Sequence, residues 1–489
     1  MTKLSLANLP QIGKKMRVPA YQRATLKPGI LHFGVGNFVR AHLCAYLDEL
    51  FNLGECHDWA LIGAGVTAVD ETMRQTLASQ DYLTTIIEQD NDHSSAHVTG
   101  SIVNIISPND KNAILTCLAD SAIRIVSLTI TEGGYFINPA SQKFDPAHPA
   151  VAKDGANAAD PSTVFGFIVA GLKARKEKGI PAFTVMSCDN VPHNGVVARN
   201  TVAGVAKLSD PTLAEWIVEN VAFPNSMVDR ITPASGDRER SLCAGQFGVE
   251  DQSPIFCEKV KQWVVEDSFP MGRPPWDKVG AQFVKDVTPW ECAKLRILNG
   301  GHAVIAYIGG LMDIHFVHEA MEHPLIRAYL KKVTDDEIRP TVPPLPGVDL
   351  QDYQRLIERR FSNPNIADTI RRLCFDGFNR QPKFIVPAMN DRLMAKKSIN
   401  GLALESALWS RYCFGTSDSG KVIEPNDPHW DSLQAKARLA KGNPQLWLNM
   451  NEIYGRAGQH PELMKHFAHY LKELWKNGLE VTVKAYLAS

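Results

Sequence analysis

The fold is decided by the stretch Gly29-Ile-Leu-His-Phe-Gly-Val-Gly36, which runs on to Ala41-His-Leu-Cys-Ala-Tyr-Leu-Asp-Glu-Leu50. The apolar run that ends at Phe33 predicts a buried strand, and the apolar positions of the second segment recur at helical spacing. Two glycines between them permit a tight turn whose backbone N–H groups can approach a pyrophosphate. Because Val39 stands where a G-x-G-x-x-G motif has its third glycine, a purely structural turn is the alternative.

The same unit recurs along the first half of the chain. Further strands are predicted at Trp59–Ile62, Ile123–Ile130 and Ala182–Met186, and the apolar residues of Thr163–Lys173 are spaced as in a helix. Strands that alternate with amphipathic helices are typical of βαβ units, which build a parallel sheet. The first part of the chain is therefore predicted to be an α/β domain.

After about residue 285 the strand pattern gives way to long helical periodicity. Examples are Leu402–Cys413, Leu446–Tyr454 and Pro461–Trp475, and the Pro/Gly-rich stretch Phe269–Trp276 precedes the change. We expect a dinucleotide-binding type of α/β domain over residues 1–285 and a helical domain over residues 286–489.

The composition excludes several classes of protein. Of 489 residues, 44% are hydrophobic, and 52 Lys and Arg stand against 53 Asp and Glu. This balance supplies no positive field for nucleic acid, and no apolar stretch reaches the roughly 18 residues of a membrane span. Nine cysteines without a C-x-x-C pair favour free thiols in the cytoplasm. No H-E-x-x-H or comparable metal-ligand spacing occurs, so we expect no metal site.

Two strand ends carry candidate contacts for a dinucleotide. Asp70 follows the second predicted strand and its turn Gly63-Ala-Gly65, where a carboxylate can bind an adenosine ribose hydroxyl and repel a 2′-phosphate. A helix cap is the structural alternative. At the third predicted strand, Thr129-Ile-Thr-Glu-Gly-Gly-Tyr135 either contacts a cofactor or only turns the chain.

A polar constellation opens the helical half of the chain. At about 100° per residue of an α-helix, Asn299 lies about 140° and His302 about 80° from Lys294, so the three can share one side. A buried amine can act as a base, and a carboxamide N–H can donate to an oxygen that becomes negative. A solvated polar stripe is the alternative from spacing alone.

Polar residues also follow the strand that ends near Met186, in Ser187-Cys-Asp-Asn-Val-Pro-His-Asn-Gly195. The carboxyl ends of parallel strands border the ligand crevice of a doubly wound sheet. Asn190 and Asn194 are therefore candidate ligand contacts, with an Asx-turn as the structural alternative.

Six segments occur in an order and spacing that resemble the polyol-specific long-chain dehydrogenase/reductase family. They span nearly the whole chain and are Gly34–His42, Thr129–Tyr135, Ser187–Asn190, Phe223–Pro233, Lys294–His302 and Asp376–Phe384. The resemblance implies a Rossmann-type N-terminal domain and a predominantly α-helical C-terminal domain that binds substrate and carries catalytic groups. It also implies a monomeric, zinc-independent enzyme that transfers hydride between a nicotinamide cofactor and a polyol/ketose pair, with substrate in the cleft between the domains.

By motif, the resemblance also implies roles for single residues. Lys294 resembles the family's general base, and Asn190 and Asn299 resemble the donors to the developing alkoxide. His302 is similar to a residue that positions substrate, and Glu291 to a carboxylate that exchanges protons with solvent.

Asp229 and Arg372 resemble the family's contacts to the polyol hydroxyls. The predicted substrate-binding residues are Asp229, Arg372, Arg380 and Asn194. The predicted cofactor-binding residues are Gly34, Val35, Gly36, Asn37, Phe38, Asp70, Glu132 and Gly133. Within the family the resemblance is closest to members that oxidise D-mannitol to D-fructose with NAD.

Two departures from the family pattern leave alternatives open. Val69-Asp70 stands where many members carry two adjacent acids, so NADP is an alternative cofactor. Phe378-Asn-Arg380 replaces a common serine pair and lysine, and Arg380 keeps the charge but not its shape. Alternative substrates are therefore D-arabinitol, D-sorbitol or a hexuronate such as fructuronate, and a non-catalytic dinucleotide sensor is the alternative from another class.

Overall fold

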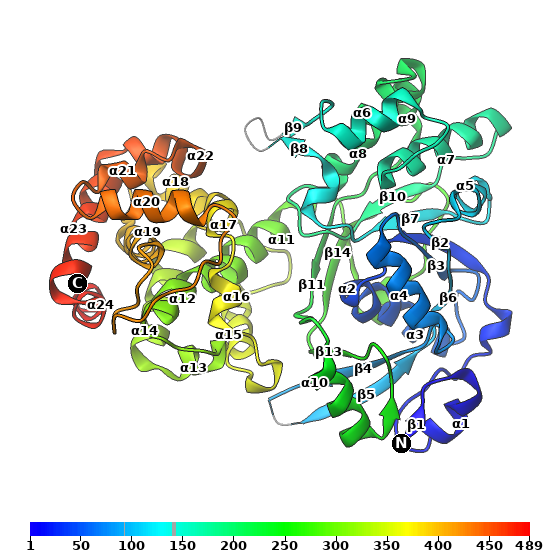
Figure 1. Cartoon of the computed structure of the whole chain (residues 1–489), viewed down its shortest axis with the longest axis horizontal. Coiled ribbons are helices and arrows are strands. Elements are labelled where there is room, and N and C mark those ends of the chain that lie inside the picture. The colour runs from blue at the N-terminus through cyan, green and yellow to red at the C-terminus, as the bar shows by residue number, and fades with distance from the viewer. Residues whose placement is uncertain (92, 139–142) are drawn as a thin grey trace. The chain divides into compact units, whose positions relative to one another are not determined.

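The computed structural model describes residues 1–91, 93–138 and 143–489. Contacts divide the chain into two compact units, Met1–Val287 and Thr288–Ser489. Figure 1 traces the first unit from blue to green and the second from green to red. The first unit is α/β and the second is helical, which confirms the fold class predicted from the sequence.

The centre of the first unit is a five-stranded parallel sheet in the order β10-β7-β2-β3-β6. Its strands are β2 (Pro28–Phe33), β3 (Ala60–Ala64), β6 (Ile102–Ile105), β7 (Ile125–Leu128) and β10 (Thr184–Ser187). In order of succession within this sheet they run 5-4-1-2-3, which matches the first five strands of a Rossmann-type sheet. The order reverses between β2 and β7, where such sheets bind their ligands.

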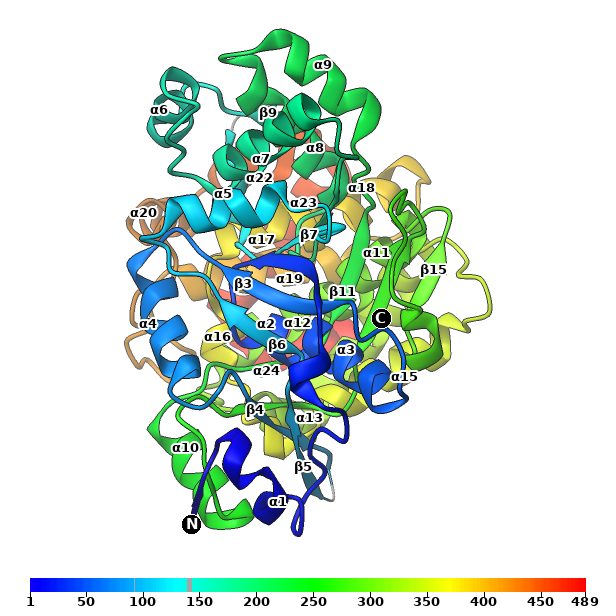
Figure 2. The same cartoon turned by 90° about the vertical axis from the view of Figure 1, so that its right-hand side faces the viewer.

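The strands are apolar because both faces of the sheet are covered. Leu31 and Phe33 pack into one buried cluster, and Ile30 packs into a second. The first cluster includes residues of α5 (Lys111–Ala119), α7 (Val164–Lys178) and α8 (Asn194–Lys207), and the second includes residues of α3 (Leu43–Asn52). Figure 2 shows α5 and α7 on the opposite side of the sheet from α3.

The register brings three strand ends to one level. Phe33 of β2 lies opposite Leu128 of β7, and Leu128 lies opposite Ser187 of β10. The segments that follow these residues, which carry most of the predicted cofactor and catalytic residues of this unit, therefore emerge at one edge of the sheet.

The remaining elements of this unit surround the sheet. The other helices are α1 (Leu9–Ile12), α2 (Asn37–Ala41), α4 (Ala68–Ala78), α6 (Pro149–Ala156), α9 (Pro211–Asn220) and α10 (Asp237–Leu242). The smaller sheets are β11 (Ser226–Asp229), β14 (Gln262–Glu266) and β15 (Gln282–Val284); β13 (Ile255–Glu258), β4 (Thr84–Gln89) and β5 (Ser94–Thr99); β1 (Thr2–Lys3) and β12 (Val249–Glu250); and β8 (Ile137–Asn138) and β9 (Lys143–Phe144).

From Thr288 to Ser489, every residue of which the structure describes, the named elements are helices. They are α11 (Thr288–Ala293), α12 (Gly300–Leu311), α13 (Val317–Glu322), α14 (Pro324–Val333), α15 (Leu350–Phe361), α16 (Ile370–Cys374), α17 (Gly377–Phe384), α18 (Val386–Met394), α19 (Asn400–Cys413), α20 (Trp430–Ala440), α21 (Gln445–Leu448), α22 (Asn451–Tyr454), α23 (Pro461–Asn477) and α24 (Leu479–Leu487), with π-helices at Lys294–Asn299 and Thr334–Ile338 and 3-10 helices at Arg339–Thr341, Pro364–Ile366 and Gly455–Gln459. Residues 401–413 of α19 are all buried, so this helix is the core of the unit.

One predicted helix is wrong. Leu446–Tyr454 was expected to be continuous but forms two short helices, α21 and α22. The break lets the Trp447 indole N–H donate to the Tyr454 hydroxyl at 3.0 Å.

Two further sequence features can be checked against the structure. Among the described residues, no helix is long and apolar enough to cross a membrane. All nine cysteines are free thiols, as their odd number and spacing predict.

Candidate functional site

The turn after β2 has open space at one of its two glycines. Gly34 has φ +89°, and a Cβ there would lie 2.1 Å from the Thr129 carbonyl oxygen, so only glycine fits. Gly36 is exposed, and a Cβ there would meet its nearest atom, the Gly34 oxygen, at 4.0 Å. The backbone at Gly36 therefore faces space that a phosphate group can enter, which fits a dinucleotide turn.

A buried histidine supports this turn. His32 Nε2 lies 2.9 Å from Thr129 Oγ1, and its Nδ1 lies 2.7 Å from Ser127 Oγ. The Thr129 hydroxyl donates to the Gly34 carbonyl at 2.7 Å, so it accepts from Nε2–H. Burial lowers the pKa of His32 to about 3, and the ring is neutral. The turn is thus fixed by uncharged groups.

Asp70 caps α4 in the structure. Its Oδ2 accepts from Val66 N at 3.0 Å, Thr67 N at 2.9 Å and Thr67 Oγ1 at 2.7 Å, and Asp70 N donates to Thr67 Oγ1 in return. A Cβ at Gly65 would lie 2.3 Å from the Asp70 Cβ, so glycine is required there. The structural alternative for Asp70 is present, and the hydrogen bonds that its carboxylate accepts from described residues use Oδ2. The contact of Asp70 with the adenosine ribose stays a prediction.

Asp189 joins the ends of β7 and β10. Its buried carboxylate accepts from Ile130 N at 3.1 Å, Thr131 N at 2.8 Å and the Tyr135 hydroxyl at 2.7 Å. Burial raises the pKa of Asp189 to about 6, although these hydrogen bonds oppose the rise.

The bonds from Asp189 hold a strained turn. Thr131 has φ +63°, a left-handed conformation that is costly for a β-branched residue. The next two residues are the predicted cofactor contacts Glu132 and Gly133, and both are exposed. A Cβ at Gly133 would meet nothing within 4 Å. Asp189 therefore supports a turn that opens onto free space.

The two candidate asparagines after β10 differ in exposure. Asn190 is exposed directly after Asp189, whereas Asn194 is fully buried. The Asn194 amide nitrogen donates to Asp189 O at 3.1 Å and Ser226 O at 2.8 Å, and its oxygen accepts from Ser226 N at 2.9 Å. Asn194 thus fastens the β10 loop to β11. Contact between Asn194 and substrate stays a prediction, and these bonds support a positioning role.

Asp229, the last residue of β11, is buried with 7% of its surface exposed. It lies opposite Gln262 in the antiparallel pair of β11 and β14. This strand end is a different part of the unit from the five-stranded sheet, so Asp229 depends on other contacts for its position.

In the second unit, the predicted catalytic segment contains a π-helix, not the continuous α-helix assumed from the sequence. The π-helix covers Lys294–Asn299, between α11 and α12. Its i→i+5 hydrogen bonds widen the turn, which brings residues five apart closer around the axis than in an α-helix. Lys294 and Asn299 are five residues apart. Such insertions are frequent at functional sites.

The side chains of this segment are buried rather than solvated. Glu291 and Lys294 are 8% exposed, Asn299 is 7% and His302 is 5% exposed. A solvated polar stripe is therefore excluded. Four buried polar side chains on three successive turns require partners, because burying such groups unpaired is costly.

His302 is buried and has one unsatisfied nitrogen. Its ring stacks on Phe361 with 4.2 Å between centroids, and its Nε2 has no hydrogen-bond partner among the described residues. Burial holds the pKa of His302 well below its usual value. Nearby arginines lower it further: Arg372, Arg380 and Arg360. A neutral, unpartnered imidazole nitrogen is suited to a ligand hydroxyl.

The two predicted arginines have different surroundings. Arg372 forms a bidentate pair with Asp368 and is half exposed. Arg380 Nη1 donates to Leu373 O at 2.8 Å and to the carbonyls of Phe375 and Arg372 at 3.3 and 3.4 Å. Arg380 therefore caps the end of α16. Both arginines lie near enough to His302 to lower its pKa, so this unit does gather these predicted residues.

Sequence reasoning missed two kinds of residue. Asp189 and Tyr135 stand inside quoted motifs but were not singled out, and only their burial and hydrogen bonds reveal their role. Arg360 lies outside every motif. In the parts of the chain that the structure describes, no group of three or more His, Cys, Asp or Glu side chains could hold a metal ion.

Comparison with known proteins gives consistent matches along the chain. The model of the mannitol dehydrogenase Rossmann domain matches residues 28–278, and that of the mannitol dehydrogenase C-terminal domain matches residues 286–475. A mannitol 2-dehydrogenase of Cereibacter sphaeroides is 55% identical over 96% of this chain and 98% of its own length.

Solved structures agree over the whole chain. The Pseudomonas fluorescens mannitol 2-dehydrogenase ternary complex with NAD and D-mannitol has a TM-score of 0.91 and 41% identity, covering 100% of both chains. A substrate-free D-sorbitol dehydrogenase has a TM-score of 0.90 and 35% identity, covering 98% of this chain and 100% of its own. By its domains, its relatives and its fold, the chain belongs to the mannitol dehydrogenase family of polyol dehydrogenases.

Proposed function

We propose that the chain oxidises D-mannitol at C2 to D-fructose with NAD and catalyses the reverse reduction. The observation that carries this proposal is the π-helical segment that buries Glu291, Lys294, Asn299 and His302 together, in a chain 55% identical to a mannitol 2-dehydrogenase. The relative whose complex holds NAD and D-mannitol supports the choice of cofactor and polyol.

The proposed proton chemistry centres on Lys294. Loss of hydride from a secondary alcohol requires that its oxygen give up a proton, and the buried Lys294 amine accepts it. Burial favours the neutral amine that a base must be. In the reverse direction the ammonium returns the proton to the ketose oxygen. Glu291, one turn earlier, exchanges this proton with solvent.

Two carboxamides stabilise the charge that develops on the same oxygen. In this proposal the side-chain amides of Asn190 and Asn299 donate N–H groups to it. In this proposal residues 1–285 hold the cofactor and residues 286–489 supply the base and bind substrate.

The residues around the glycine turn fit the cofactor. When bound, NAD would supply the nicotinamide that takes up the hydride from C2 of the polyol. The open space at Gly36 and Gly133 suits its phosphates and backbone contacts, and Asp70 suits the adenosine ribose. The proposed contacts are Gly34, Val35, Gly36, Asn37, Phe38, Asp70, Glu132 and Gly133. Val69 in place of a second acid keeps NADP as the alternative.

The remaining hydroxyls of the polyol are assigned to Asp229, Arg372 and the Nε2 of His302. Arg380 shapes this region from the end of α16, and Asn194 positions the loop that carries Asn190. Because Arg380 Nη1 is already directed at three carbonyls, a hexuronate carboxylate is disfavoured as its partner. The 35% identical D-sorbitol dehydrogenase makes D-sorbitol the second candidate.

A substrate panel tests this proposal. Initial rates are measured for D-mannitol, D-arabinitol, D-sorbitol and D-fructose with NAD and with NADP. We expect the highest kcat/KM for D-mannitol and D-fructose with NAD. Cofactor binding without turnover on any of them would instead identify a sensor. The same protein is treated with a chelator, which should leave the rate unchanged, and its mass in solution should be that of a monomer.

A further inference from the structure

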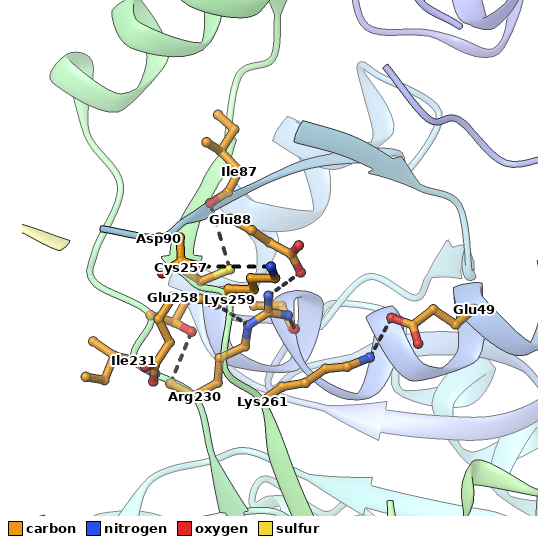
Figure 3. A network of polar contacts seen from close by, with 12 residues as sticks. Glu49, Ile87, Glu88, Asp90, Arg230, Ile231, Cys257, Glu258, Lys259 and Lys261 are labelled. Carbon is orange, nitrogen blue, oxygen red and sulfur yellow. Dashed lines mark hydrogen bonds and ion pairs between the residues drawn. The ribbon is translucent and has the colours of Figure 1, made fainter. Parts of the chain in front are cut away.

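Arg230 lies at the centre of a polar network in the first unit, although neither the family motif roles nor the proposed reaction uses it. Figure 3 shows it between Glu88 and Glu258, with Lys261 paired to Glu49 in the same region. The Arg230 side chain is fully buried. It directly follows Asp229, the proposed polyol contact.

Arg230 connects three segments that are distant in sequence. Its Nε donates to Glu258 O at 3.0 Å and its Nη2 to Glu88 Oε1 at 2.6 Å. Its Nη1 donates to the carbonyl of Ala41, the last residue of α2. The planar guanidinium can direct donors to all three acceptors at once, which a lysine ammonium on a flexible stem cannot match. Arg230 therefore links the polyol strand to the helix that begins at the glycine turn.

The start of α2 is tied to the same segment. Asn37 Nδ2 donates to Pro233 O at 3.2 Å and to Ser235 Oγ at 3.3 Å. Arg40 Nη2 donates to Asn37 Oδ1 at 2.7 Å, which fixes the Asn37 amide in this orientation. Residues 230–235 are thus bonded to both ends of α2.

A third connection lies across the strand from Asp229. His42, directly after α2, contacts the carbonyl of Gln262 through Nε2 at 3.1 Å, and Gln262 pairs with Asp229. Burial keeps His42 neutral by lowering its pKa to about 3, so this contact does not change in the neutral pH range. The glycine turn with α2 and the end of β11 are therefore parts of one hydrogen-bonded body.

We propose that Arg230 is a positioning residue that couples the cofactor turn to the polyol contact Asp229, so that binding at one raises affinity at the other. The inference rests on the proposed function for the identity of the two ligands. By linkage, the coupling must act equally in both directions.

A buried arginine can also be purely structural, and the same unit offers a matched control. Arg175 is fully buried, and within the described part of the chain it donates only to carbonyls and a thioether, among them Leu118 O at 2.7 Å and Pro181 O at 2.8 Å. Its partners belong to α5, to the connections after α5 and α7, and to residue 271, not to α2 or β11. Substitution of Arg175 should therefore lower stability without changing the coupling.

The test compares Arg230→Lys, Glu88→Gln and Arg175→Lys with the unchanged chain. Initial rates with D-mannitol and NAD give kcat and both KM values. NADH affinity is measured by fluorescence without mannitol and with saturating mannitol, and the ratio of the two dissociation constants measures the coupling. Tm reports stability.

For Arg230→Lys we expect the KM for mannitol to rise about tenfold, kcat to stay within threefold, and the coupling ratio to move at least threefold towards 1. Glu88→Gln, at a partly exposed carboxylate, should shift the same quantities less. Arg175→Lys should lower Tm and leave the KM for mannitol, kcat and the coupling ratio unchanged.

Arg230→Lys and Glu88→Gln with unchanged KM and coupling ratio would overturn the proposal and leave Arg230 a structural residue, whatever their Tm. If Arg230→Lys does not fold, the Glu88→Gln result decides alone. Failure of the proposed function is a separate result, because the unchanged chain would then show no turnover of D-mannitol while NADH binding still reports on the variants.

Discussion

Two buried polar groups at the edge of the parallel sheet and the buried His302 of the helical unit differ in their hydrogen bonds. At the sheet edge, the carboxylate of Asp189 and the amide of Asn194 have protein partners on both sides. In the helical unit, His302 buries an Nε2 that has no partner among the described residues. One region is complete before a ligand binds, and the other contains a group that only a ligand can satisfy.

This difference separates groups that hold the site from groups that act on substrate. Removing a satisfied group leaves its partners unpaired and costs stability, about 1–3 kcal/mol for each buried donor or acceptor. Removing an unsatisfied group should cost ligand binding without costing stability. The following substitutions test the distinction.

Lys294→Ala should have the largest effect. Without the amine no side chain in this proposal takes the hydroxyl proton, so we expect kcat to fall by about 10³-fold or more at neutral pH. NADH should bind as before, because the glycine turn belongs to the other unit. Steady-state kinetics and NADH fluorescence measure the two effects. Near-normal turnover across pH would contradict the assignment of Lys294 as base.

Asp189→Asn should have the second-largest effect. An amide offers one acceptor oxygen where Ile130 N, Thr131 N and the Tyr135 hydroxyl now converge, and its NH₂ faces N–H groups. We expect a lower Tm and NADH affinity weakened about tenfold or more. Thr131→Gly is the companion variant, because glycine adopts φ +63° without strain. Adding it should recover part of the lost affinity; no recovery would mean that strain at Thr131 is not what Asp189 controls.

The same carboxyl predicts a pH dependence with opposite signs for binding and stability. Its pKa is about 6, above the usual 3.8. As pH falls through 6, protonation removes an acceptor from the turn, so NADH affinity should fall. The folded state binds this proton more readily than the unfolded state, so this group contributes stability below about pH 4 and loses it as pH rises to 6. NADH titrations and Tm between pH 5 and 7.5 measure both, and Asp189→Asn should abolish both trends.

His302→Phe tests the buried nitrogen that has no hydrogen-bond partner among the described residues. Phenylalanine keeps the stacking on Phe361 and removes the buried Nε2. We expect Tm to stay the same or rise, because no protein hydrogen bond through Nε2 is lost, while the KM for mannitol rises about tenfold. Phe361→Leu is the control: it should lower Tm with a smaller effect on KM. A fall in Tm for His302→Phe without a change in KM would place His302 with the structural groups.

Much of this arrangement could be predicted from the sequence, because it depends on local pattern. The strands β2, β3, β7 and β10 were visible as apolar runs, and the glycine turn as Gly34-Val-Gly36. Lys294, Asn299 and His302 were grouped by their helical spacing, and the structure buries all three side chains.

The rest depends on contacts that pattern does not encode. In the π-helix at Lys294–Asn299 each hydrogen bond spans five residues, whereas in an α-helix it spans four. This local difference leaves the apolar periodicity of the sequence almost unchanged. Asn194 is hydrogen-bonded to Ser226, which lies 32 positions away in the sequence. Arg230 is hydrogen-bonded to Ala41, which lies 189 positions away. Such partners are set by topology, so their roles became visible only in three dimensions.

Glu405→Gln tests the comparison in the core of the helical unit, through stability alone. Burial raises the pKa of Glu405 to about 8, against a hydrogen bond from the Gln381 amide that lowers it. The acid is therefore mostly protonated at pH 7. Its Oε1 accepts from Gln381, and its Oε2 has no partner among the described residues. Glutamine keeps the acceptor and cannot ionise.

The sign of the effect follows from linkage. The folded state holds a proton on Glu405 up to about pH 8, whereas the unfolded state loses it near 4.5, so the stability from this group is present below pH 4.5 and is lost as pH rises through 8. The neutral amide introduced by the substitution removes this loss. Denaturant unfolding should give nearly equal stability at pH 5 and a gain of about 4 kcal/mol at pH 9 for Glu405→Gln.

Glu337→Gln is the matched control for this measurement. Both Glu337 oxygens are satisfied by the first N–H groups of α19, Gly401 N and Leu402 N, each at 2.9 Å. An amide NH₂ facing one of these donors should destabilise the unit by about 1–3 kcal/mol at both pH values. Higher stability of Glu405→Gln at pH 9, together with lower stability of Glu337→Gln, would show that satisfied and unsatisfied buried groups also differ in the core of the helical unit. No gain at pH 9 would mean that Glu405 is ionised in the folded state, and that an unsatisfied buried oxygen is not by itself a sign of a neutral acid.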